Sequence, residues 1–95
     1  MFVVLLTFSD NKAQAGQFMD GHKDWIKRGF DEDVFLLTGS LKPEGGGGIL
    51  AYNTTYEELL ERVATDPFVV ENIVKAEIQE IAPAMTDERL SFLKD

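Results

Sequence analysis

The 95-residue sequence predicts one α+β domain, with strands and helices in the order strand, helix, strand, strand, helix, strand. Three observations lead to this prediction. Apolar residues repeat every second position in some segments and every third or fourth position in others, and glycine or proline separates the segments. With 44% hydrophobic residues the chain can bury one core, but a second domain would have too few residues. Residues 1–95 are therefore expected to form a single domain.

The first strand is expected at residues 2–8 and the first helix at about residues 12–28. The opening segment is short and rich in valine, leucine and phenylalanine, and it stops at a Ser-Asp-Asn turn. In the helix the apolar side chains recur at spacings of three, four and seven, which places them on one face together with His22. These side chains are Ala15, Phe18, Met19, Trp25 and Ile26. Gly29, directly after two cationic residues, is typical of a helix end.

The second and third strands are expected to form a hairpin. Residues 34–41 are mostly apolar and lie between three acidic residues and Pro43. The run of glycines at 45–48 is predicted to be the loop, because glycine loses more backbone entropy in regular structure than other residues do. The third strand then covers residues 49–53.

The second helix is expected to begin at Thr54 or Thr55, since each is followed three residues later by glutamate, the pattern of a capping box. Asp66-Pro67 ends it, because proline disfavours helical geometry in the preceding residue. Residues 68–70 are expected to be a connection. The predicted buried face of the helix consists of Tyr56, Leu59, Leu60, Val63 and Ala64.

The fourth strand is expected at residues 73–82, where apolar and polar side chains alternate as in a strand with one wet face. Pro83 closes it, and residues 84–95 form a C-terminal extension that carries a short helix. This order of elements predicts a ferredoxin-like βαββαβ fold with an antiparallel four-stranded sheet. In its usual layout the first and third strands are central, and the charged fourth strand suits an edge.

The first two strands have apolar side chains on both faces. In the first strand Val3 and Leu5 alternate with Phe2, Val4 and Leu6; in the second, Phe35 and Leu37 alternate with Val34 and Leu36. Two helices cover only one face of such a sheet, and soluble monomers rarely expose a large contiguous apolar patch. We therefore expect a homodimer in which the sheets pack face to face about a twofold axis.

Charge and composition exclude several classes of function. With 9 Lys and Arg against 17 Asp and Glu, the formal net charge of −8 repels nucleic-acid phosphates and anionic lipid head groups. Cysteine is absent, and one histidine with dispersed carboxylates gives no metal-ligand spacing. We expect neither metal nor organic cofactor, and no nucleic-acid or membrane partner. The apolar N-terminus lacks the basic region and cleavage site of a signal peptide, so a cytoplasmic protein is expected.

His22 and Asp66 are the candidate catalytic residues. Histidine titrates near neutral pH, and a carboxylate partner can fix its tautomer and stabilise the imidazolium. Both helices of a ferredoxin-like fold lie on the same face of the sheet, so the two side chains could meet. The alternatives are an inert, hydrogen-bonded core histidine and a turn aspartate before proline.

Four further residues are candidates for substrate binding. Gly39 within a strand indicates a bulge or the close approach of a ligand to the backbone, and Ser40 offers a hydroxyl there. Trp25 lies near His22 on the first helix, although such a residue more often builds a core than a pocket. Phe68 directly follows Asp66-Pro67.

Taken together, these segments resemble the YciI-like, or YCII-related, protein family over about residues 1–83. The segments are His22-x-x-Trp25-Ile26, residues 36–41, the glycine hairpin into Ile49, Glu57-Glu58-Leu59-Leu60 and Asp66-Pro67-Phe68. The resemblance implies a dimeric α+β barrel of two ferredoxin-like subunits, with His22 and Asp66 as a dyad. Family members resemble small-molecule enzymes, and dehydrochlorination of an aromatic substrate is attached to one branch.

The leading functional hypothesis is a cofactor-free enzyme that acts on a small cyclic or aromatic substrate. His22 would move a proton in an isomerisation or elimination while Asp66 orients the imidazole. Proton transfer by a positioned acid or base contributes about a hundred- to ten-thousand-fold in rate. The alternative is a non-catalytic dimeric domain that binds a small metabolite or serves as an accessory domain. A purely structural dimer without a pocket is the third possibility.

Overall fold

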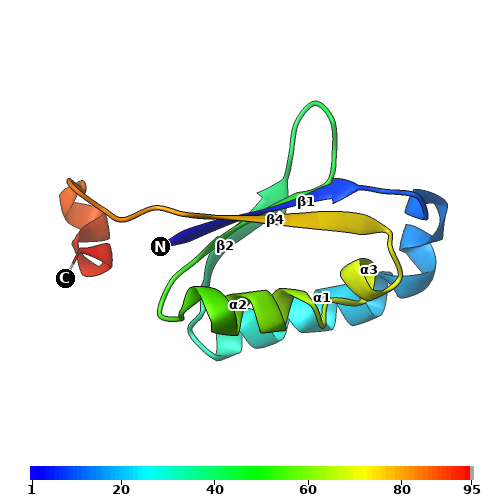
Figure 1. The fold of residues 1–95 in the computed structure, drawn as a ribbon, viewed down its shortest axis with the longest axis horizontal. Helices are drawn as coiled ribbons and strands as arrows, with labels where there is room; N and C mark the ends of the chain where they lie inside the picture. Colours follow the sequence, from blue (N-terminus) through cyan, green and yellow to red (C-terminus); the bar gives the residue numbers. More distant parts are fainter. Residues whose placement is uncertain (95) are drawn as a thin grey trace.

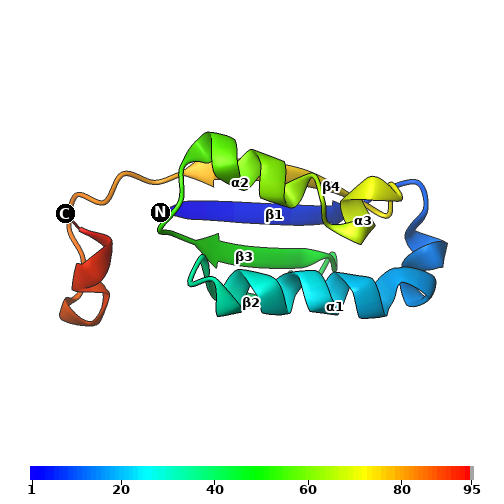
Figure 2. The ribbon, with the colours of Figure 1, turned by 90° about the horizontal axis from the view of Figure 1, so that it is seen from below.

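The computed structural model describes residues 1–94 and contains one antiparallel sheet with helices on one face (Figures 1 and 2). The strands are β1 (Phe2–Phe8), β2 (Phe35–Ser40), β3 (Gly47–Ala51) and β4 (Val74–Glu80). Their spatial order is β2-β3-β1-β4, so β1 and β3 are central. The α-helices are α1 (Ala15–Asp31), α2 (Tyr56–Val63) and α3 (Pro67–Val70). The predicted ferredoxin-like βαββαβ fold is confirmed.

The core lies between the sheet and the helices. Along β1 the residues Phe2, Val4 and Leu6 are buried toward the helices, and α1 lies against β2 while α2 lies against β4. The largest fully buried apolar side chains are Trp25, Leu59, Ile73 and Val4. Burial of a Leu- or Val-sized side chain contributes about 1.5–3 kcal/mol, which explains why an alternating strand and two amphipathic helices hold together.

The opposite face of the sheet is uncovered by any element of residues 1–94 (Figure 1). Val3 of β1 lies opposite Leu50 of β3, which in turn lies opposite Leu37 of β2. Leu37 is 54% exposed, and Val3, Leu5 and Leu50 are half-buried. These four side chains form an apolar strip across the centre of the face, which we call the open-face strip.

Helix α1 differs from the prediction at both ends. Residues 12–14 form a separate 3-10 turn, η1 (Lys12–Gln14), and the α-helix continues past Gly29 to Asp31. Gly29 is buried inside the helix, where a Cβ atom would lie 2.1 Å from Cδ2 of Phe35. The prediction that Gly29 ends the helix is therefore wrong, because this glycine serves close packing of helix against strand.

The glycine hairpin is shorter than predicted. Gly47 and Gly48 belong to β3, since each has a paired neighbour on both β1 and β2, and this pairing holds them in the sheet. The turn is confined to residues 41–46. At Gly46 the backbone has φ of 91°, and a Cβ atom would lie 2.2 Å from the carbonyl oxygen of Leu6, so only glycine fits there.

A β-bulge changes the alternation of side chains in β2. The register with β3 shifts between Phe35 and Leu37, so that Phe35 is buried against the helices while Leu37 lies on the open face. The prediction that Phe35 and Leu37 share one face is thus wrong. Beyond the bulge, Thr38 and Ser40 lie on the helix side of the sheet, as bulges commonly re-aim side chains beside functional sites.

Helix α2 begins with the predicted capping box. Thr55, and not Thr54, is the N-cap: its side chain accepts from the amide of Glu58 while the Glu58 carboxylate accepts from the amide of Thr55. The buried face is narrower than predicted, because only Leu59 and Val63 are buried and Tyr56, Leu60 and Ala64 are exposed. The helix lies near the edge strand β4, where a narrow stripe suffices for contact.

The C-terminal extension lies beyond the end of the sheet (Figures 1 and 2). Its predicted short helix is a 3-10 segment, η2 (Glu88–Leu93), capped by Asp87. Phe92 contacts Tyr52 edge-on, with ring centroids 5.4 Å apart. Within residues 1–94 no helix has the length and hydropathy needed to cross a bilayer.

Candidate active site

The structure brings His22 and Asp66 into hydrogen-bond contact. His22 projects from α1, Asp66 directly precedes α3, and Nδ1 of the imidazole lies 2.8 Å from Oδ1 of the carboxylate. The Asp66 side chain is completely buried, whereas 13% of the His22 side chain is exposed. A histidine that meets solvent on one side and a buried carboxylate on the other has the arrangement of an acid–base pair.

Asp66 is fixed in place by the start of α3. Its Oδ1 atom also accepts a hydrogen bond of 3.0 Å from the backbone amide of Phe68, which makes Asp66 the N-cap, and Pro67 occupies the first helical position. Residues 68–70, expected as a connection, thus form one helical turn. Asp66 is therefore both the turn aspartate before proline and the partner of His22, two roles that were alternatives in the sequence.

The imidazole ring is held by aromatic stacking. The His22 and Phe68 rings are parallel with centroids 4.0 Å apart, and the Trp25 ring lies 6.1 Å from His22 on α1. Trp25 itself is 1% exposed and donates from Nε1 to the carbonyl of Arg62 at 3.0 Å. Trp25 therefore supports the ring from within the core, in agreement with the alternative that this residue builds core and not pocket.

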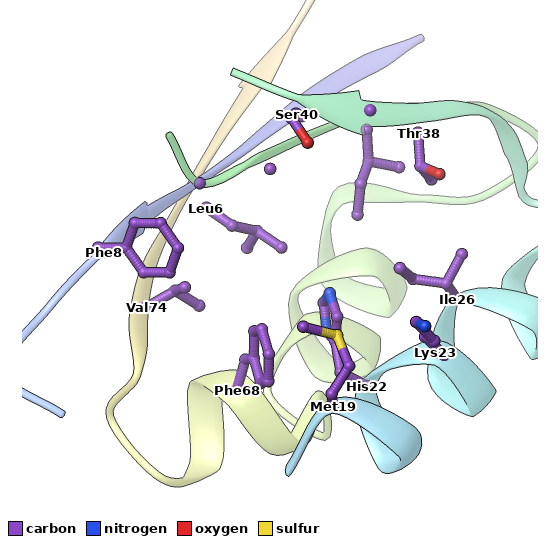
Figure 3. A pocket seen from close by; sticks show the side chains of 15 residues that line it. Leu6, Phe8, Met19, His22, Lys23, Ile26, Thr38, Ser40, Phe68 and Val74 are labelled. Atoms are coloured by element: carbon purple, nitrogen blue, oxygen red, sulfur yellow. The ribbon is translucent and has the colours of Figure 1, made fainter. Parts of the chain in front are cut away.

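The hydrogen bond with Asp66 determines which ring nitrogen of His22 is available to a ligand. A carboxylate only accepts hydrogen bonds, so in the neutral ring the hydrogen resides on Nδ1 and Nε2 keeps a free lone pair. Figure 3 shows the His22 ring beside Phe68, on the side of α1 that faces the sheet. The free nitrogen can take a proton from a ligand in this space, and the resulting imidazolium is stabilised by Asp66.

A cavity of about 310 Å³ opens beside His22, between α1, α3 and the sheet (Figure 3). Most of its lining is apolar, and the hydroxyls of Thr38 and Ser40 and the ammonium of Lys23 are its polar side chains besides His22. The lining residues are Leu6, Phe8, Met19, His22, Lys23, Ile26, Thr38, Gly39, Ser40, Gly46, Gly47, Gly48, Ile49, Phe68 and Val74. The volume is at the small end for ligand pockets and suits a single-ring molecule.

Of the residues predicted to bind substrate, Gly39, Ser40 and Phe68 line the cavity, and Trp25 lies outside its lining. Gly39 pairs in regular register with Gly48, so the bulge expected at Gly39 lies earlier in β2. Lys23 and Thr38 also line the cavity, although neither was predicted to do so. Helical spacing places Lys23 on the same face of the first helix as Met19, so its position beside the cavity could have been predicted. Thr38 lies on the helix side of the sheet only because of the bulge in β2.

Metal ligands are not grouped in the described part of the chain. Among residues 1–94 no three His, Cys, Asp or Glu side chains lie close enough together to hold a metal ion.

Comparison with known proteins gives a similarity in structure but none in sequence. No protein family model and no curated protein matches the chain. It is similar in structure to 5-chloro-2-hydroxyhydroquinone dehydrochlorinase (TftG) from Burkholderia phenoliruptrix AC1100, solved in complex with 2,5-dihydroxybenzoquinone. The TM-score is 0.69 at 11% identity, over 85% of this chain and 93% of that chain. The two chains therefore share a fold. At this identity the similarity shows the fold alone.

Proposed function

We propose that this chain is a YciI-like enzyme that performs acid–base chemistry on a small cyclic or aromatic substrate without metal or organic cofactor. One observation carries the proposal: a partly exposed imidazole, bonded at 2.8 Å to a fully buried carboxylate, lines a cavity of single-ring size. A histidine needed only for packing would not require a charged partner, since burying an aspartate is costly unless it is paired.

The reaction is an elimination or an isomerisation. Nε2 of His22 takes a proton from an activated ring carbon, and the C–H electron pair becomes the π-bond of a new double bond. In an elimination a leaving group on the neighbouring carbon departs with its bonding pair. In an isomerisation the proton returns at another position. Asp66 keeps Nδ1 protonated and stabilises the imidazolium. Proton transfer by a positioned base such as His22 contributes about a hundred- to ten-thousand-fold in rate.

The structural neighbour supports an elimination. Its name describes a dehydrochlorinase, and its structure contains a dihydroxybenzoquinone, a single planar ring. A ring of that size is compatible with the 310 Å³ cavity of the present chain.

The proposal includes a homodimer formed through the sheet face. The open-face strip of Val3, Leu5, Leu37 and Leu50 is unpartnered among residues 1–94 and lies on the face away from the cavity. Packing this strip against a second copy would remove apolar surface from water, which favours association. A dimer of this kind would leave both cavities accessible from the helix side.

The cytoplasmic location expected from the sequence remains a prediction.

A panel of chlorinated hydroxyquinols and cyclic ketones tests the activity, with chloride release and ring absorbance as readouts. We expect turnover by the wild type and loss of at least a hundredfold in His22→Ala. Asp24→Asn, an exposed carboxylate on the same helix, is the control and should retain activity. Equal turnover in wild type and His22→Ala would contradict the proposal. A ligand that raises the melting temperature yet stays unchanged would favour the binding-module alternative.

A further inference from the structure

The lining of the cavity contains a cation and no acidic residue, although the molecule as a whole is acidic. The chain carries 17 acidic and 9 basic residues, yet no Asp or Glu is among the 15 residues that line the cavity in the described part of the chain. Lys23 is the one permanently charged residue of that lining. Since like charges elsewhere on the molecule would repel an anion, a local cation free of nearby lining carboxylates is a selective feature.

Lys23 is positioned for a ligand by its place on α1. Met19, His22, Lys23 and Ile26 have the spacing i, i+3, i+4, i+7, so they lie on the helix face that borders the cavity (Figure 3). Among residues 1–94 Lys23 takes part in no ion pair. Lys27, one turn further on, is bonded to Asp31 at 2.7 Å and lies outside the cavity lining.

The sheet side of the cavity supplies hydroxyls and space. Thr38 and Ser40 on β2 bring hydroxyl groups, and Gly47 on β3 presents backbone without a side chain. A Cβ atom on Gly47 would lie 3.8 Å from Cδ1 of Leu6, an ordinary contact distance, and its φ is not in the left-handed region. Alanine would therefore fit the backbone at position 47 but would take room from a ligand.

We propose that the cavity selects a single-ring anion, a carboxylate or a phenolate, and that Lys23 is its specificity-determining residue. The ammonium pairs with the charged oxygen of the ligand, and the absent side chain at Gly47 leaves room for the ring. The inference rests on the proposed function only in taking this cavity as the substrate site. Charge-assisted hydrogen bonds are roughly twice as strong as neutral ones, so the preference for the anion should be measurable.

Benzoate and benzamide provide a matched pair of probes, because they have nearly the same shape and differ in charge. Binding is measured by calorimetry or by NMR shifts of the cavity residues, in the wild type and in Lys23→Met, Lys27→Met and Gly47→Ala. Lys23→Met keeps an unbranched side chain of similar length and good helix propensity, so it removes the charge without disturbing α1. Lys27→Met is the matched control on the same helix.

The wild type is expected to bind benzoate about tenfold more tightly than benzamide, in line with the strength of a charge-assisted pair. Lys23→Met should abolish this preference by weakening benzoate alone, whereas Lys27→Met should preserve it. Gly47→Ala should weaken both probes alike, which separates the size effect from the charge effect. Equal affinities for the two probes in the wild type, an undiminished preference in Lys23→Met, or no saturable benzoate binding at millimolar concentration would overturn the inference.

The outcome is independent of catalysis. Benzoate offers the dyad no acidic C–H bond and no leaving group, so its binding reports on Lys23 even if the substrate panel yields no turnover. Conversely, equal benzoate binding by the wild type and Lys23→Met would overturn the role of Lys23 and leave the His22–Asp66 proposal intact.

Discussion

A single oxygen of Asp66 accepts two hydrogen bonds, one from Nδ1 of His22 and one from the amide of Phe68. The other carboxylate oxygen, Oδ2, is buried and has no hydrogen-bond partner among the described residues. Keeping a carboxylate in this position is costly, and the cost is offset by the two contacts that it makes. The residue therefore links the local structure of α3 to the orientation of the imidazole.

Asp66→Asn tests that link at the scale of single residues. Asparagine caps helices about as well as aspartate, so α3 should remain folded, but its amide group can donate to Nδ1. We expect the hydrogen of the neutral ring to shift from Nδ1 toward Nε2. Because the chain has one histidine, ¹⁵N NMR of the imidazole reports this change without ambiguity. Asp24→Asn is the control, and identical spectra for wild type and Asp66→Asn would contradict the dyad.

Asp66→Ala removes the cap and the partner of His22 together. It leaves a buried amide and an imidazole N–H without acceptors, which costs about 1–3 kcal/mol of unfolding free energy. Asp66→Asn should cost much less. Urea denaturation of the wild type and both variants measures these differences, and equal stability of the wild type and Asp66→Ala would show that the carboxyl group carries no structural role.

At the scale of elements, two glycines of α1 occupy opposite environments. A Cβ atom at Gly29 would overlap the ring of Phe35, whereas at Gly16 it would meet no atom within 4 Å. Gly29→Ala should therefore lower the unfolding free energy by about 1–3 kcal/mol through overpacking. Gly16→Ala should raise it by up to about 1 kcal/mol through helix propensity. Thermal melts test both, and a neutral Gly29→Ala would mean that helix and strand approach less closely than described.

The capping box of α2 provides a second test at this scale. Thr55→Ala removes the acceptor for the Glu58 amide and should cost about 0.5–2 kcal/mol, whereas Thr54→Ala should cost little. The two threonines are adjacent and chemically identical, so each serves as the control for the other. In denaturant unfolding, Thr55→Ala should be less stable than Thr54→Ala. The reverse order would mean that the helix begins one residue earlier, with Thr54 as its N-cap.

At the scale of the whole molecule, the sheet has one covered face and one uncovered face. Light scattering of the wild type should give twice the 10.6 kDa chain mass. Leu37→Glu places a charge in the open-face strip and should yield a folded monomer, since Leu37 is already 54% exposed in the single chain. Leu60→Glu, 50% exposed on α2, is the matched control and should remain a dimer. A wild type that is monomeric at micromolar concentration would contradict the dimer.

The amino-acid sequence by itself determined the order of the main elements, the bounds of β1 and the capping box of α2, whereas the helical turn α3 was expected to be a connection. These features depend on hydrogen bonds and side-chain spacing within a few residues, so a local pattern is sufficient to specify them. The pairing of His22 with Asp66 was also predictable, because the fold class places both helices on one face. The role of that pair in catalysis stays a prediction.

Only the tertiary structure decided features that depend on contacts between distant segments. Gly29 has the pattern of a helix end, yet Phe35 requires it inside the helix. Gly47 and Gly48 are in a strand because β1 and β2 pair with them on both sides. The bulge in β2 turns Thr38 and Ser40 toward His22. Register and close approach are set by the packing of the whole sheet and its helices, and local sequence patterns do not encode them.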